Sequence, residues 1–79
     1  MDDTPTGQQR GHPPRVVVYP VVNANPRYRR VDILGRRVGK AYSLRDVAEF
    51  CRRAGLEDID VELDESVQWI GGGPRQWQE

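Results

Sequence analysis

The sequence contains few of the residues on which catalysis and covalent cross-linking depend. Its 79 residues include one cysteine, Cys51, and one histidine, His12. A single cysteine excludes an intramolecular disulfide, and a small domain without disulfides is typical of a reducing compartment. A catalytic thiol needs a nearby base and an accessible, electropositive site, but Cys51 falls on an apolar helix face and His12 in a polar tail. We therefore expect no catalytic residue and no enzyme.

Long apolar segments are missing as well. The longest run covers residues 16–22, whereas a membrane-spanning helix needs about 20 apolar residues. Residues 1–10 lack the basic start and the apolar stretch of a signal peptide. We expect a cytoplasmic protein that does not engage a membrane.

Two patterns that suggest ligand binding have structural explanations. Residues 35–41 place three residues rather than four between their glycines, and Ala41 stands where a phosphate loop has Ser or Thr. Acids alternate with aliphatic residues over 58–64, but outward side chains of one strand lie roughly 6.6 to 6.8 Å apart. That spacing is too wide for several carboxylates to converge on one cation. We expect no metal and no cofactor.

The chain is long enough for one domain with polar tails. Residues 1–14 contain three prolines and two glycines, and Met1 is their only hydrophobic residue. Such a segment cannot bury enough surface to offset its ordering entropy, so it is predicted to be a disordered N-terminal tail. Residues 71–79 form a Gly-rich C-terminal tail that contains Trp77. The remaining residues, 15–70, are expected to form a single α+β domain.

Periodicity predicts one helix and five strands. The helix, residues 43–55, has an N-cap at Ser43, an acid at Asp46 that resembles a capping box, an apolar stripe and a C′ residue at Gly55. The strands are expected at residues 16–22, 28–34, 38–42, 58–64 and 67–70. The predicted fold is α+β: a small, mainly antiparallel sheet covered on one face by a single helix, in the order β-β-β-α-β-β.

The turn after the second strand sets the register of the hairpin that follows. A two-residue loop, centred on residues 34–35 or 35–36, places Val31, Ile33 and Val38 on one face, because cross-strand partners share a face. A three-residue loop would separate Val38 from Ile33. The first arrangement makes the better apolar face and is preferred, while its centre stays open.

The net charge of zero conceals two segments of opposite charge. Residues 15–40 carry seven basic residues and one acid, whereas residues 56–79 carry seven acids and one base. These segments can neutralise each other within the fold, pair between the chains of a homodimer, or form separate binding surfaces.

The basic residues of the predicted hairpin are interleaved with tyrosines. Guanidinium groups bind phosphates bidentately and tyrosines stack on bases, so a nucleic-acid surface is physically sensible. The sequence pI of about 6.6 is low for such a surface, and a protein partner can use the same charges. The candidate partner-binding residues are Arg27, Tyr28, Arg29, Arg30, Arg36, Arg37, Lys40 and Trp77.

The segment from Trp69 to Trp77 joins three glycines to a proline and a second tryptophan. Glycine permits positive φ and close backbone approach. Trp77 either folds back to cap the core beside Trp69 or stays exposed as an anchor for a partner, since tryptophan is over-represented at interface hot spots.

The sequence resembles short uncharacterised proteins of actinobacteria in four segments. These are residues 28–35, the pair Val38-Gly39, the helical segment and the Trp69-x-Gly-Gly-Gly-Pro-x-x-Trp77 pattern. The resemblance implies a bacterial origin and no function. Our leading hypothesis is a small non-enzymatic regulatory or protein–protein interaction module with an unidentified protein partner. The alternative is a nucleic-acid-binding module that uses the Arg-rich hairpin, residues 27–40.

Overall fold

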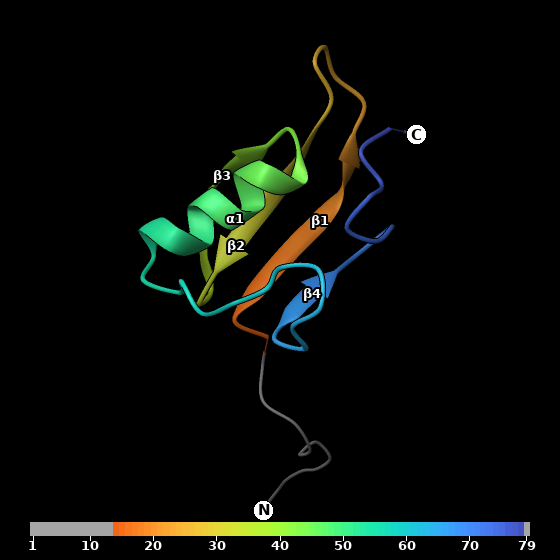
Figure 1. Ribbon diagram of the computed structural model, residues 1–79. Helices are drawn as coiled ribbons and strands as arrows, with labels where there is room; N and C mark the ends of the chain where they lie inside the picture. The colour runs from red at the N-terminus through yellow and green to blue at the C-terminus, as the bar shows by residue number, and fades with distance from the viewer. Residues whose placement is uncertain (1–13, 79) are drawn as a thin grey trace, which may run out of the picture.

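The computed structural model describes residues 14–78 and contains one sheet and one helix (Figure 1). The elements in chain order are β1 (Val16–Val22), β2 (Tyr28–Ile33), β3 (Arg36–Ala41), α1 (Leu44–Arg53) and β4 (Val67–Trp69). The sheet order is β3-β2-β1-β4. β2 pairs antiparallel with β1 and β3, whereas β4 pairs parallel with β1, so the sheet is mixed. The α+β class is confirmed, and the observed order is β-β-β-α-β.

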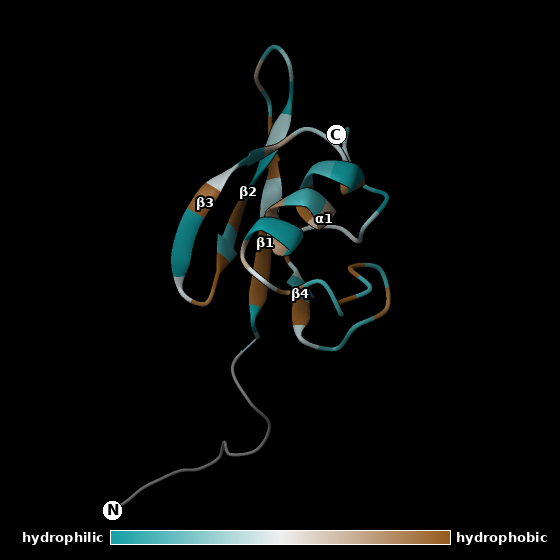
Figure 2. Cartoon of the chain, turned by 60° about the vertical axis from the view of Figure 1, so that its left-hand side comes forward, coloured by the Kyte–Doolittle hydropathy of each residue, from teal (hydrophilic) through white to brown (hydrophobic). Residues whose placement is uncertain are grey.

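The core lies between the sheet and α1. Inward side chains follow the two-residue period of the strands and meet the apolar stripe of the helix. Figure 2 shows mostly apolar colour along β1, both polar and apolar colour along β2, and polar colour on the outer side of α1. The buried hydrophobic residues are Val16, Val18, Val31, Ile33, Ala41, Val47, Cys51, Val61 and Val67.

The hairpin between β2 and β3 turns through Leu34 and Gly35, whose φ angles are 52° and 82°. Positive φ at both positions is the geometry of a type I′ turn, and it resolves the open centre of the predicted two-residue loop. The register then shifts after Val31, which pairs with Gly39 instead of Val38. The prediction that Val38 joins the apolar face is therefore wrong, and Val38 is 38% exposed.

Gly39 takes this place because the ring of Phe50 occupies the space above it. A Cβ at Gly39 would lie 3.0 Å from Phe50 Cζ, and the φ of Gly39 is +153°. The bulge thus exchanges a valine contact for close packing of α1 on β3. The sequence pattern shows the glycine but not the ring that requires it.

Both ends of α1 satisfy backbone groups in an identifiable way. Asp46 Oδ2 accepts a hydrogen bond of 2.8 Å from the Tyr42 N–H, while the Ser43 side chain makes no capping bond. At the other end, the Leu56 N–H donates to the Cys51 carbonyl at 2.8 Å, and Gly55 has φ +83°. These features are the Schellman motif expected at Gly55.

Residues 58–64 form turns instead of the predicted strand. The Asp64 N–H donates to the Asp60 carbonyl at 2.8 Å, and the Glu62 N–H donates to Asp60 Oδ1 at 3.1 Å. Short acidic side chains that accept local N–H groups compete with strand pairing. Val61 is still buried, whereas Leu63 is 81% exposed, so the alternating pattern does not mark a strand here.

The N-terminal tail predicted over residues 1–14 lies outside the described residues except for Pro14. Across residues 14–78, no helix is long and apolar enough to cross a membrane.

Candidate functional site

The two faces of β2 carry different kinds of side chain. Its burial alternates, so Arg29, Val31 and Ile33 are buried while Arg30 is exposed. Residues of one strand point alternately to the two faces, which places Tyr28, Arg30 and Asp32 on the face away from the helix. We call this face the open face.

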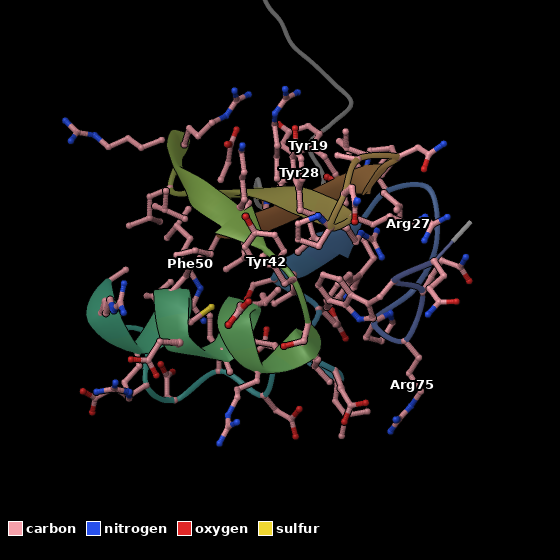
Figure 3. The ribbon with its side chains drawn as sticks, turned by 90° about the horizontal axis from the view of Figure 1, so that it is seen from above. Tyr19, Arg27, Tyr28, Tyr42, Phe50 and Arg75 are labelled. Carbon is pink, nitrogen blue, oxygen red and sulfur yellow. The ribbon has the colours of Figure 1, made fainter. Side chains whose placement is uncertain are left out.

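Register extends the open face over the neighbouring strands. Val17 and Arg37 pair with Asp32 from either side, and Lys40 pairs with Arg30. Figure 3 shows Tyr19 and Tyr28 on this side of the sheet, with Phe50 on the other side facing α1. The open face therefore consists of Val17, Tyr19, Tyr28, Arg30, Asp32, Arg37 and Lys40.

Two cations stand directly opposite each other in the middle of the open face. Arg30 pairs with Lys40 across the β2–β3 ladder, and like charges in that position destabilise a sheet. Among residues 14–78, no carboxylate lies within ion-pair distance of either side chain. Within the described residues, the pair therefore lacks a carboxylate partner, and a bound anion would relieve its repulsion.

Two tyrosines adjoin these cations at one end of the face. The Tyr28 and Tyr42 rings meet edge to face, with centroids 6.3 Å apart and an interplanar angle of 64°. Lys40 Nζ lies 4.6 Å from the Tyr28 ring centroid, within the range of a cation–π contact. Tyr42 is 49% exposed, so its ring can accept a further stacking partner.

At the other end, Asp32 is the one acid on this face. Its Oδ2 accepts a hydrogen bond of 3.0 Å from the Tyr19 hydroxyl, and that bond raises the pKa of Tyr19. Arg37 Nε lies 3.6 Å from Oδ1 and pairs with the carboxylate. Asp32 and Tyr19 also line a hollow of about 540 Å³.

The acidic segment after α1 does not neutralise the arginines of β2 and β3. Within the described part of the chain, the ion pair that it forms joins Glu62 to Arg75 at 2.9 Å. Asp64 instead accepts hydrogen bonds from the hydroxyl and the N–H of Ser66, and these bonds lower the pKa of Asp64. Within the described residues, the acidic segment therefore makes no ion pair with the arginines of β2 and β3.

Arg29 is directed to the opposite face and is completely buried. Its guanidinium donates all five of its N–H groups to backbone carbonyls at 2.7 to 2.9 Å. The acceptors are Tyr19, Ile70, Gly72, Gly73 and Gln76. Burial lowers the pKa of Arg29, and the carbonyl dipoles take the place of a carboxylate.

Two tryptophans complete the surroundings of Arg29. Its Cζ lies 5.2 Å from the Trp69 ring centroid and 5.5 Å from that of Trp77, and the two rings pack edge to face. Trp77 Nε1 donates to the Pro74 carbonyl at 2.7 Å. We name Arg29, the two tryptophans and residues 70–76 the arginine clasp. The C-terminal tail predicted over residues 71–79 is, as far as residue 78, part of this packing.

The clasp changes the assignment of two predicted partner-binding residues. The guanidinium of Arg29 has no exposed surface to offer a partner, so we correct its role to internal support. Trp77 is half-buried, with its ring against Arg29 and Trp69. An edge of Trp77 borders a hollow of about 340 Å³ that Arg27 and Tyr42 also line.

The other predicted residues reach the surface, but not as one cluster. Tyr28, Arg30, Arg37 and Lys40 meet on the open face, while Arg27 and Arg36 are exposed at opposite ends of the hairpin strands. Tyr19 and Asp32 are not among the predicted site residues, because each looks like an ordinary strand residue in the sequence. Their link needs the β1–β2 register, which two-residue alternation alone does not supply.

The structure also describes the surroundings of the Cys51 thiol and of the side chains that could hold a metal ion. Cys51 is buried, and burial raises the pKa of its thiol. Residues 14–78 contain no group of three or more His, Cys, Asp or Glu side chains placed to hold a metal ion.

Comparison with known proteins assigns no family: the chain matches no protein-family model, and no curated protein or solved structure gives a significant match. The resemblance to actinobacterial proteins therefore stays a prediction.

Proposed function

We propose that this protein is a non-enzymatic binding module for single-stranded nucleic acid and that the open face is its interface. The observation that carries the proposal is the Arg30–Lys40 pair, two opposed cations without a carboxylate partner in the described residues. A phosphate between them would relieve their repulsion, and guanidinium and ammonium groups are the usual phosphate ligands in proteins.

The neighbouring tyrosines favour a single strand over a duplex. Tyr42 is about half exposed beside Tyr28, and unpaired bases stack on such rings at about 1 to 3 kcal/mol per base. A duplex keeps its bases stacked inside the helix. It therefore cannot place an unpaired base on the exposed Tyr42 ring, whereas a single strand can.

An acidic protein surface is the second candidate, and the position of β3 favours it. β3 is an outer strand of the sheet, and outer strands can pair with an added strand. Its cations and its bulge, however, are the features by which proteins discourage such pairing. The prediction that Trp77 is an exposed anchor for a protein partner also loses support, because its ring packs inside the arginine clasp.

Fluorescence anisotropy with labelled oligonucleotides of mixed sequence tests the proposal. We expect a single strand to bind at low salt more tightly than its duplex. Affinity should fall steeply as salt rises, with a slope of about −0.7 per phosphate neutralised. Absence of binding at low salt would overturn the proposal. Binding to acidic polypeptides but not to oligonucleotides would favour the second candidate.

A pair of double variants locates the interface. Arg30→Ala with Lys40→Ala should weaken single-strand binding about tenfold or more and should reduce the salt slope by about 0.7, because the phosphate held between the two cations is no longer neutralised. Arg45→Ala with Arg53→Ala removes the same charge from α1, where both residues are exposed. This control should bind nearly as wild type, and an equal loss in both variants would exclude the open face as the interface.

A further inference from the structure

The hollow at the Asp32 end of the open face has the size and chemistry of a small ligand site. Its volume is about 540 Å³, within the usual range of roughly 300 to 1,000 Å³ for such sites. Val17 and Leu34 contribute apolar walls, Tyr19 a phenol ring and Asp32 a carboxylate. Arg15 adds a cation at the same hollow. Mainly apolar walls with a few polar groups suit a planar heterocycle.

Asp32 supplies the polar group that would determine which heterocycle binds. Its Oδ2 already accepts the Tyr19 hydroxyl. Its Oδ1 is buried and, within residues 14–78, accepts no hydrogen bond, since Arg37 Nε at 3.6 Å lies beyond normal hydrogen-bond length. A buried acceptor without a donor is costly and rare in native structures. A ligand N–H group would satisfy it once the side chain of Arg37, which is 61% exposed and pairs with the same oxygen, moves aside.

We infer that the Asp32 hollow is a base subsite that selects nucleobases carrying an exocyclic amino group, which Asp32 Oδ1 accepts. This inference rests on the proposed function. Carboxylates accept hydrogen bonds from cytosine N4 and, by the same chemistry, from the amino groups of adenine and guanine. Thymine and uracil present a carbonyl oxygen at the corresponding position, and the carboxylate repels it. The Tyr19 ring provides a stacking surface, and Arg15 and Arg37 are placed beside the hollow for the adjoining phosphate.

Homopolymeric oligonucleotides of equal length separate base selection from backbone binding. Oligo-dC, oligo-dA and oligo-dT offer the protein the same phosphates, so a difference in affinity reports on the bases. We expect oligo-dC and oligo-dA to bind on the order of tenfold more tightly than oligo-dT, from one discriminating base contact. Equal affinities for all three would overturn the inference while leaving the proposed function intact. Failure of all three to bind at low salt would overturn both.

Two variants test whether Asp32 is the selecting residue. Asp32→Asn keeps an oxygen for the Tyr19 hydroxyl but adds an N–H₂ donor, so binding to oligo-dT should rise and the preference should vanish or invert. Arg30→Ala should weaken binding to all three oligonucleotides and keep their ratio. An unchanged dC-to-dT ratio in Asp32→Asn would overturn the role of Asp32. If that variant does not fold, the wild-type comparison decides the inference by itself.

Free nucleosides distinguish an independent subsite from one that needs the strand. Cytidine should displace labelled oligonucleotide more effectively than uridine, because the two differ at the amino and carbonyl position that Asp32 would read. Equal displacement by both nucleosides would contradict recognition of the amino group.

Discussion

Arg29 and Arg30 are neighbours in sequence and have opposite environments. Arg29 is fully buried beneath the sheet and satisfies every N–H group on backbone carbonyls. Arg30 is exposed on the open face, opposite Lys40 and without a carboxylate at ion-pair distance in the described chain. One arginine therefore supports the fold, and the other is free to bind. Two-residue alternation along β2 is the cause of the difference.

The largest expected effect comes from breaking this comparison directly. Arg29→Met should lower the free energy of unfolding by at least about 3 kcal/mol, because five backbone carbonyls packed around the buried side chain lose their donors. A domain of this size is stable by only a few kcal/mol, so the variant should be largely unfolded. Arg30→Met should stay within about 0.5 kcal/mol of wild type. Urea unfolding followed by far-UV circular dichroism measures both.

Arg29→Lys separates charge from geometry in the same experiment. Lysine keeps the positive charge but has three donors instead of five, so its stability should fall between those of wild type and Arg29→Met. Equal unfolding midpoints for the Arg29 and Arg30 variants would show that the arginine clasp contributes nothing to stability.

The helix and the strands under it were predictable because their signals are local. Ser43, the apolar stripe and Gly55 define α1 within a few residues of sequence, and the β-branched run of residues 16–22 matches β1 within its own length. The predicted strand at residues 58–64 failed because Asp60 and Asp64 accept nearby N–H groups, which alternation does not reveal.

The arginine clasp and the Asp32 hollow were not predictable, because both join distant segments. Arg29 donates to carbonyls more than forty residues away in the sequence. Because these acceptors are backbone groups and not a carboxylate, no side chain in the sequence indicates that this arginine is buried. Asp32 meets Tyr19 only through the β1–β2 register. The sequence shows that residues 15–40 are basic and residues 56–79 acidic. Whether these two segments neutralise each other depends on where the fold places residues 56–65, which the sequence does not show.

A second prediction concerns the backbone that surrounds Arg29. Gly71 has φ +74°, and a Cβ there would lie 2.8 Å from Pro20 Cβ. Gly71→Ala should therefore cost about 2 kcal/mol through the left-handed backbone and the clash. Gly73 has open space around its Cβ position, so Gly73→Ala should change stability by less than about 0.5 kcal/mol. Thermal melts of both variants provide the measurement, and equal melting temperatures would mean that the turn is not tightly packed.

The smallest expected effect concerns whether water reaches Cys51, between the sheet and α1. Cys51 is 2% exposed, and burial raises the pKa of its thiol above the ordinary value. A raised pKa in the folded state means that the neutral thiol is favoured there. The resulting stabilisation is fully present below the unfolded thiol pKa of about 8.5 and is lost as pH rises through the folded value.

Comparison with Cys51→Ala isolates that thiol from the other groups that titrate at high pH. Between about pH 7 and pH 10, the free energy of unfolding of wild type should fall more than that of the variant, as measured by urea unfolding at each pH. Equal slopes would indicate that water reaches the thiol. α1 would then pack less tightly on the sheet at Cys51 than the 2% exposure of that residue indicates.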